Sequence, residues 1–75
     1  PLTRTEFDIL AVLAREPGTA VDRPSLLQSV WGPGYLDDHV VDVHVANLRR
    51  KLGDDPEHPR FVETVRGVGY RLSVS

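Results

Sequence analysis

The pattern of apolar and polar positions is clearest between residues 39 and 52, HVVDVHVANLRRKL. Four apolar side chains recur there at i, i+4, i+7 and i+11, which puts them in one stripe of an α-helix. This stripe consists of Val41, Val45, Leu48 and Leu52. The opposite face mixes small apolar, amide and cationic groups, in His39, Val40, Val43, Asn47 and Arg50. A solvated face more often carries pairs of Glu and Lys, so the pattern predicts a helix with one side in the core and the other available to a ligand.

The last turn of this helix is cationic, with Arg49, Arg50 and Lys51 in succession before Gly53 as C-cap. Like charges so close together repel one another, which favours an anion nearby. The alternative is that cations at a helix C-terminus simply oppose the helix dipole. The run by itself leaves both interpretations open.

A first helix is predicted near the start of the chain. Thr3 followed by Glu6 forms a capping box, which is a typical helix start. The apolar positions that follow have helical spacing and stop before Pro17, so this helix lies mostly in the core. After the turn, Ala20 and Val21 could form a minimal strand.

A second helix follows, with Asp22 as its cap and Pro24 in its first turn. Its buried side is formed by Leu26, Leu27, Val30 and Trp31. Residues 32–36 cannot continue this helix because their two glycines and their proline favour turns. Asp37 or Asp38 then caps the third helix. Two helices connected in this way resemble a helix-turn-helix with an enlarged turn.

Two strands are predicted at the end of the chain, in residues 61–66 and 70–74, which are rich in Val, Thr, Leu and aromatic side chains. Residues 67–69, Gly-Val-Gly, connect them, and the two glycines allow positive φ in a tight hairpin. Arg66 and Arg71 lie near its tip. The elements together predict an α+β domain of three helices and a basic hairpin.

Length and composition narrow the class of protein. A chain of 75 residues makes one small domain, residues 1–75, with no room for a deep catalytic cleft. It contains no cysteine, which fits a reducing cytoplasm, and no run near the roughly 18 apolar residues that span a membrane. No Gly-x-Ser-x-Gly motif or zinc signature points to an enzyme, and nothing indicates a cofactor. We therefore expect a soluble, unexported protein without catalytic activity.

The net charge of -2 argues against binding to nucleic acid, but the distribution of the charges changes this picture. Residues 49–75 hold six of the nine cations against four acids. Three of those acids, Asp54, Asp55 and Glu57, lie in one loop and can point away from a ligand. The charge is thus polarised along the chain, and one face can still meet phosphate.

Four segments resemble, in order and spacing, the C-terminal effector domain of the OmpR/PhoB family of bacterial two-component response regulators: LTRTEFDIL, LLQSVWG, VVDVHVANLRRKL and ETVRGVGYRL. The resemblance covers nearly the whole chain. It implies a winged helix-turn-helix of the α+β class, with a three-helix core and a C-terminal hairpin wing; the family's N-terminal four-stranded sheet is largely absent from this chain. It also implies binding to double-stranded promoter DNA, usually as a head-to-tail pair on direct repeats, under the control of a receiver domain and a sensor kinase.

The resemblance puts the third helix, about residues 38–52, in the major groove. Base-facing positions of the family correspond to Val40, Val43 and Asn47, on the outward face described above. Valine methyl groups can meet thymine methyl groups, and the Asn47 amide can pair with adenine N6 and N7. Backbone or peripheral contacts correspond to His39, His44, Ala46, Arg49 and Arg50. The family often has arginine at positions 39, 46 and 47, so we expect weaker phosphate anchoring and a different site preference here.

The hairpin, about residues 61–74, corresponds to the wing. Arg66 matches the arginine that enters the adjacent minor groove, where a narrow A·T-rich groove concentrates negative potential. Thr64 and Tyr70 match positions that contact the DNA backbone, and Trp31 can offer its indole N–H to a phosphate. The loop before the third helix corresponds to the segment through which some members touch RNA polymerase. It comprises Gly32, Pro33, Gly34, Tyr35, Leu36 and Asp37, a composition that an inert connector would share.

Several of these residues have simpler explanations. Trp31 suits the core as well as a DNA contact. His39 and His44 lie on different faces of the helix and lack the partners of a zinc site. Asp42 suits an ion pair inside the domain better than a contact to cytosine. The main alternative function is a winged helix used only for protein contacts, which would explain the acidic net charge; salt dependence separates it from DNA binding.

Overall fold

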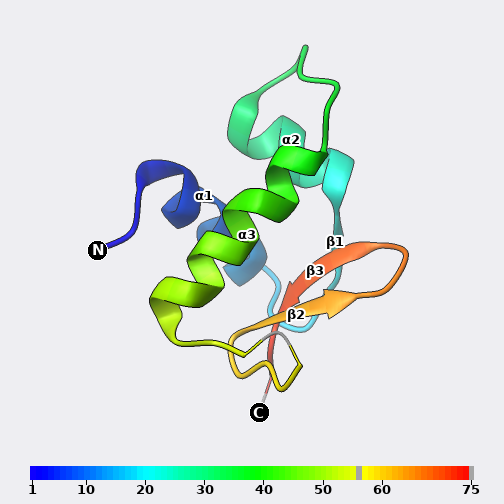
Figure 1. Ribbon diagram of the computed structural model, residues 1–75. Helices are drawn as coiled ribbons and strands as arrows, with labels where there is room; N and C mark the ends of the chain where they lie inside the picture. The colour runs from blue at the N-terminus through cyan, green and yellow to red at the C-terminus, as the bar shows by residue number, and fades with distance from the viewer. Residues whose placement is uncertain (56, 75) are drawn as a thin grey trace.

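Three helices surround one core, with a small sheet at one side (Figure 1). The computed structural model describes residues 1–55 and 57–74. The elements follow in the order α1 (Arg4–Ala14), β1 (Val21–Asp22), α2 (Arg23–Trp31), α3 (His39–Leu52), β2 (Val62–Val65) and β3 (Gly69–Leu72). In Figure 1, α3 runs across the front and the β2–β3 hairpin lies beside it. None of the helices in the described ranges has the length and apolar character needed to cross a membrane.

Capping explains where α1 and α2 begin. The Thr3 hydroxyl accepts a hydrogen bond from the Glu6 backbone N–H at 3.2 Å, and the Glu6 carboxylate accepts one from the Thr3 N–H at 2.8 Å. Asp22 Oδ1 accepts from the Ser25 N–H at 2.7 Å. The predicted capping box and cap are therefore confirmed. The Glu6 carboxylate also pairs with Lys51 Nζ at 2.8 Å, which fastens α1 to the end of α3.

The ends of α3 are set by three polar or glycine residues. Asp38 occupies the N-cap position, but its side chain makes no capping bond. Instead, Asp37 Oδ1 accepts from the His39 N–H at 3.0 Å. At the other end, Gly53 takes the left-handed conformation, with φ 71° and ψ 27°, that ends a helix. The predicted span of the helix is thus confirmed.

The core lies where the helices meet the sheet. Ten buried apolar side chains form it: Ile9, Val12, Leu13, Leu26, Leu27, Val41, Val45, Leu48, Val62 and Tyr70. The inner stripe predicted for α3 is confirmed, because three of its members are wholly buried and Leu52 packs against the core. Burial of this stripe fixes the rotation of α3 about its axis, so the opposite face must point outward.

The sheet has three antiparallel strands in the order β1-β3-β2. Val21 pairs with Tyr70 and Asp22 with Gly69, so the predicted minimal strand exists one residue later than expected. Gly69 was expected to lie in the hairpin turn, and this expectation was wrong. Gly67 has a positive φ of 76°, whereas Gly69 is a member of β3 and not of the turn. A Cβ at position 69 would lie 2.1 Å from the Val21 carbonyl oxygen, so glycine there permits the close approach of β1.

Candidate nucleic-acid interface

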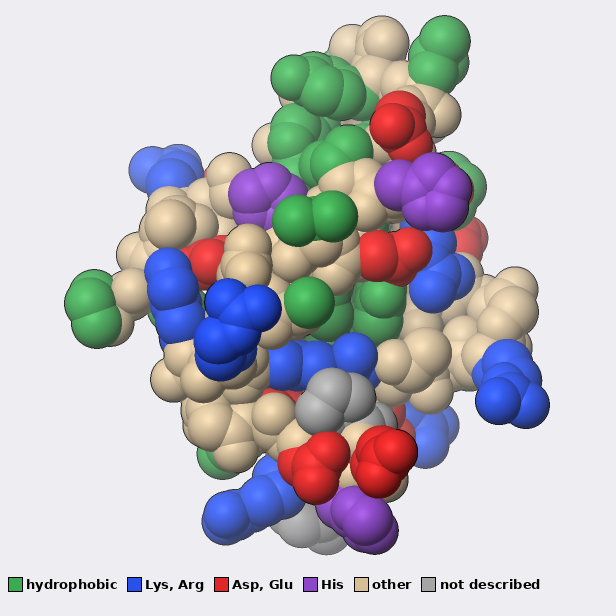
Figure 2. All heavy atoms as spheres, viewed as in Figure 1, with side chains coloured by type: hydrophobic (Ala, Val, Ile, Leu, Met, Phe, Trp, Pro, Cys, Tyr) green, Lys and Arg blue, Asp and Glu red, His purple; other side chains and the backbone are tan. Residues whose placement is uncertain are grey.

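The outward face of α3 lies at the front of Figure 1 and is drawn as spheres in Figure 2. Val43 is 58% exposed, and His39 and Arg50 are exposed as well. Val40 is less available than expected, because it is half-buried and packs against the core. Figure 2 shows Lys and Arg side chains on this face and at the hairpin, with Asp and Glu side chains both among them and at the lower end. The surface is therefore a mixed one, with apolar groups, exposed cations and some acids.

Asn47 is oriented by the residue one turn further on. Arg50 Nη1 donates a hydrogen bond to Asn47 Oδ1 at 3.1 Å. The amide N–H groups and one lone pair of the oxygen remain for a ligand. An amide placed in this way can donate and accept at the same time, which is what pairing with the edge of adenine requires.

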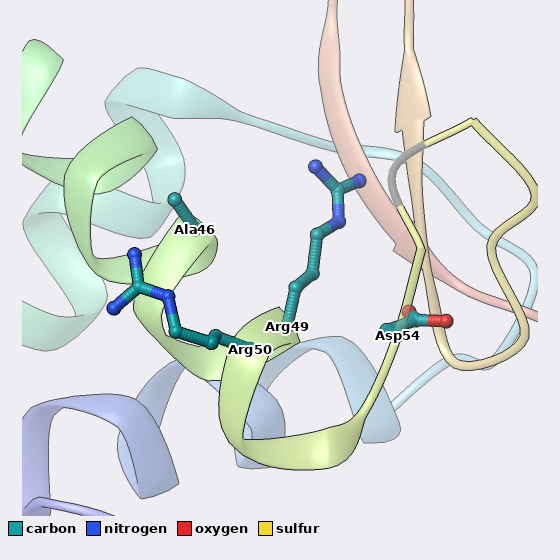
Figure 3. A pocket seen from close by; sticks show the side chains of 4 residues that line it. All are labelled: Ala46, Arg49, Arg50 and Asp54. Atoms are coloured by element: carbon teal, nitrogen blue, oxygen red, sulfur yellow. The ribbon is translucent and has the colours of Figure 1, made fainter.

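Arg49 and Arg50 are neighbours in the sequence, but their side chains point in different directions (Figure 3). Arg50 is exposed, whereas Arg49 is only 8% exposed. The Arg49 guanidinium donates to the Val62 carbonyl oxygen at 3.0 and 3.2 Å and to Thr64 Oγ1 at 2.7 Å. Because successive helix residues are turned by about 100°, the two side chains cannot face the same way. The expected DNA contact of Arg49 is therefore corrected to an internal one that fastens β2 to α3.

Tyr70 also has an internal partner. It is 5% exposed, and its hydroxyl donates to Asp42 Oδ1, which accepts from Arg23 Nε at 2.8 Å as well. Burial raises the pKa of Tyr70, and the Asp42 carboxylate raises it further, so the hydroxyl keeps its proton. The expected pairing of Asp42 inside the domain is confirmed. The backbone contact expected for Tyr70 is not supported, since its one donor is already used; Thr64 stays exposed on β2.

Trp31 closes α2 and lies against His44 of α3. Their ring centroids are 5.3 Å apart with the rings inclined at 56°. Trp31 is half-buried and packs against the core, in agreement with its simpler explanation. His44 is half-buried, and its Nδ1 has no hydrogen-bond partner among the described residues. Residues 1–55 and 57–74 contain no cluster of three or more His, Asp or Glu that could hold a metal ion.

A hollow opens beside the C-terminal half of α3. It is lined by Ala46, Arg49, Arg50 and Asp54, which Figure 3 labels. Position 46 is one of those at which the family often has arginine, and a longer side chain there would enter this space. The alanine therefore leaves an opening next to the exposed Arg50 guanidinium.

The loop between α2 and α3 projects at the top of Figure 1. Tyr35 is 53% exposed and Leu36 is 94% exposed, and Figure 2 shows apolar side chains gathered there. Gly32 and Gly34, with φ of 95° and 105°, end α2 and turn the chain. An exposed apolar loop of this kind suits a contact with another protein.

The turn of the hairpin presents one arginine to solvent. Arg66 is exposed and takes part in none of the hydrogen bonds or ion pairs of the described residues. Arg71 was expected near the tip as well. It lies opposite Glu63 in the sheet and pairs with that carboxylate at 2.6 Å. Arg66 is therefore the hairpin arginine that is placed to meet an anion.

Asp54 has a structural role that the sequence analysis missed. It is 8% exposed, and its carboxylate accepts backbone hydrogen bonds from Arg60, Phe61 and Val62 at 2.6, 3.2 and 2.9 Å. Burial alone would raise the pKa of this carboxyl, but the three N–H groups outweigh it and hold the pKa below its usual value. Asp54 is thus a buried acceptor of backbone hydrogen bonds, unlike the exposed Asp55. Its position directly after the helix C-cap was the signal that could have separated it from the other loop acids.

These observations define a class of protein. α2, the enlarged turn and α3 form a helix-turn-helix, and β2 and β3 form a hairpin beside its second helix. The outward face of α3 and the turn of the hairpin are both exposed. This arrangement is a winged helix-turn-helix, and the predicted α+β fold is confirmed.

Comparison with known proteins identifies the family. The family described as "Transcriptional regulatory protein, C terminal" matches residues 1–72. The transcriptional regulatory protein KdpE of Mycobacterium tuberculosis is 51% identical over 72 residues, which are 95% of this chain and 32% of KdpE. The DNA-binding response regulator MtrA of Mycolicibacterium smegmatis is 51% identical over 71 residues, which are 93% of this chain and 31% of MtrA. The chain thus spans about a third of the length of these curated relatives.

Solved structures agree with this result. The DNA-binding domain of RstA from Klebsiella pneumoniae, in complex with the RstA box, has a TM-score of 0.88 at 37% identity, covering 97% of this chain and 73% of that chain. The Thermotoga maritima OmpR/PhoB homologue DrrB has a TM-score of 0.86 at 36% identity, covering 99% of this chain and 34% of that one. The chain belongs to this family, the C-terminal DNA-binding domains of OmpR/PhoB-type response regulators. It is a domain of transcription factors and not of enzymes.

Proposed function

We propose that the domain binds double-stranded DNA sequence-specifically, with α3 in the major groove and the hairpin wing, about residues 61–74, in the adjacent minor groove. One observation carries the proposal: three of the four residues of the inner stripe of α3 are wholly buried, while the opposite face, with Val43 58% exposed, is left outward beside an exposed hairpin turn. A helix of this shape fits the major groove of B-DNA. The similarity to the RstA domain, whose structure is in complex with the RstA box, supports binding to DNA by analogy.

Base edges are read by Val43 and Asn47 in this proposal, with Val40 at the border of the contact. The Val43 methyl groups meet a thymine methyl, and the Asn47 amide pairs with adenine N6 and N7. Phosphates are met by cations and polar groups around this centre, namely Trp31, His39, His44, Arg50 and Thr64. Arg66 enters the minor groove, where a narrow A·T-rich segment attracts a guanidinium.

The wider context is also part of the proposal. In the whole regulator, a receiver domain and its sensor kinase control this domain, which binds direct repeats as a tandem dimer in the cytoplasm. The exposed loop of residues 32–37 touches RNA polymerase. The support is family membership, together with the exposure of Tyr35 and Leu36 in that loop.

Selection of bound duplexes from a random pool tests the proposal. We expect one enriched motif, repeated in the same direction with centres roughly one helical turn, about 10 bp, apart. A pool without an enriched motif after repeated rounds would reject sequence-specific binding. A single motif without a repeat would reject tandem binding alone.

A second candidate is a winged helix used only for protein contacts. The net charge of -2 and the exposed Leu36 favour it. The two candidates differ in their response to salt, because binding to DNA releases counterions from phosphates.

A further inference from the structure

A cluster of charged and aromatic side chains joins the wing to both helices of the helix-turn-helix. Tyr70 of β3 is its centre. The guanidinium carbon of Arg23, at the start of α2, lies 5.2 Å from the centroid of the Tyr70 ring, and that of Arg49, near the end of α3, lies 5.4 Å from it. A guanidinium within about 6 Å of an aromatic ring is attracted to it. One tyrosine thus connects three elements.

Asp42 of α3 completes the first attachment. Its Oδ1 accepts from Arg23 Nε at 2.8 Å and from the Tyr70 hydroxyl. Burial alone would raise the pKa of the Asp42 carboxyl, but the hydrogen bonds from Tyr70 and Arg23 outweigh it and hold the pKa below its usual value. The carboxylate therefore stays charged and keeps both of its partners at neutral pH.

Arg49 makes the second attachment, to the other strand of the hairpin. It donates to the Val62 carbonyl oxygen and to Thr64 Oγ1, both in β2. Asp42 and Arg49 are seven positions apart, which is close to two full helical turns, so they lie on the same side of α3. Two points on one side of α3, each bound to a different strand, fix both the distance and the angle between the hairpin and this helix.

We propose that Arg23, Asp42, Arg49 and Tyr70 form a brace that sets the angle of the wing to α3, and so makes Arg66 read its groove in register with Asn47. This inference rests on the proposed function. The four side chains act as positioning residues. They hold Arg66 and Asn47 in place and do not contact the bases themselves. Since the brace is formed before binding, the ordering of the hairpin is not an additional cost on the DNA.

The hairpin needs such a brace because its other attachment to the domain is small. A two-stranded hairpin by itself is marginally stable, and β1 adds only two paired residues, Val21 and Asp22, to its edge. The turn that carries Arg66 lies beyond these pairs. Without a second attachment, the hairpin could pivot about β3 and carry Arg66 away from the groove.

Two variants test the brace with a readout of specificity. Tyr70→Phe removes the hydroxyl, and Asp42→Asn removes the charge that holds Arg23. The dissociation constant is measured on two duplexes that share the best α3 site and differ only in an A·T-rich or a G·C-rich flank under the wing. In both variants, we expect the ratio of the two constants to fall by about threefold or more, towards the ratio measured for Arg66→Ala. A change of this size corresponds to the net contribution of one hydrogen bond.

Asp42→Asn separates the brace from plain electrostatics. Removal of a negative charge near DNA should by itself tighten binding on both duplexes equally. The brace predicts instead that the preference for the A·T-rich flank is lost. Tyr35→Phe is the matched control, because it makes the same chemical change on an exposed loop and should leave the ratio unchanged. An unchanged ratio in both brace variants, with folding verified by thermal unfolding, would overturn the inference.

The brace can also be tested in the free protein. Such a measurement does not depend on whether the wing contacts DNA. Residual dipolar couplings of backbone N–H bonds in α3 and the hairpin should fit one alignment tensor in the wild-type protein. In Tyr70→Phe and Asp42→Asn, the hairpin should need a separate and smaller tensor. One common tensor in both variants would show that the brace is dispensable. A wild-type protein without flank preference would instead reject the wing's part in the proposed function.

Discussion

Asn47 is the side chain of α3 whose chemistry most clearly suits the reading of a base. It is half-buried at the outward face, and its oxygen already accepts from Arg50 at 3.1 Å. That bond restricts the rotation of the amide, so part of the ordering needed for pairing with adenine is present in the free protein. The family often has arginine at this position, which would favour guanine instead.

Replacement of this amide gives a prediction at the residue scale. Asn47→Ala should weaken binding to the best site by about 1 to 3 kcal/mol and relax discrimination at one base pair, because a bidentate contact is lost. The measurement is a comparison of dissociation constants on the best site and on its single-base variants. Equal weakening on scrambled duplexes would mean that Asn47 does not read a base.

Asp54 gives a second prediction, about stability. Its pKa is lowered in the folded protein, so its contribution is complete above the unfolded value of about 4 and is lost as the pH falls through the folded value. Asp54→Asn should lower the free energy of unfolding at pH 7 by about 2 kcal/mol, since three backbone N–H groups lose a charged acceptor.

Urea unfolding at pH 7 and at pH 3 checks this prediction. The difference between wild type and Asp54→Asn should shrink at the lower pH, because the unfolded wild-type chain then binds a proton at Asp54 that the folded state resists. Asp55→Asn is the matched control, since Asp55 is the next residue and its side chain is exposed. The same difference at both pH values would contradict the assigned role.

Two neighbouring residues show what the sequence could not decide. Arg49 and Arg50 have the same side chain in the same cationic run, yet one is buried against β2 and the other is exposed. The difference depends on where β2 passes, and no local pattern contains that information. The same holds for Asp54 among the loop acids, whose partners follow six to eight residues later.

At the scale of elements, the helices were predictable because each has a local signature. The capping box at Thr3, the cap at Asp22 and the left-handed Gly53 all act within a few residues, and all were confirmed. The sheet was less predictable. β1 has only two residues, and its pairing with β3 requires a glycine at position 69 for a reason that involves a distant carbonyl group, that of Val21.

The facing of α3 gives a prediction at this scale. Leu48 is wholly buried at the centre of the inner stripe. Leu48→Ala should lower the free energy of unfolding by about 2 to 5 kcal/mol, through lost apolar burial and the cavity that remains. Denaturant unfolding measures the change, and Val43→Ala serves as control because Val43 is 58% exposed. A Leu48→Ala protein as stable as the control would show that the facing of the helix is wrong.

At the scale of the whole molecule, the position of the charges says more about binding than the net charge does. The net charge is -2, yet part of the acid is used internally: Glu6 pairs with Lys51, Asp42 with Arg23, and Asp54 with backbone groups. The outward face of α3 and the turn of the hairpin keep Arg50 and Arg66 exposed. A slightly acidic domain can therefore present a cationic surface to phosphate.

Salt dependence tests this arrangement. If four or five phosphates are neutralised, the logarithm of the association constant should fall with the logarithm of salt concentration with a slope of about -4. Binding isotherms on the selected duplex at several salt concentrations give the slope. A slope near zero would favour a winged helix that contacts proteins only.

The central claim is that the outward face of α3 lies among the bases of the major groove. Isotope-filtered nuclear Overhauser spectra of the labelled domain on its selected duplex test it most directly. We expect contacts from the Val43 methyl groups to major-groove protons, such as thymine methyl or cytosine H5, and none from Val45, which is wholly buried. A complex in which Val43 contacts no DNA proton, while another element contacts the bases, would contradict the account.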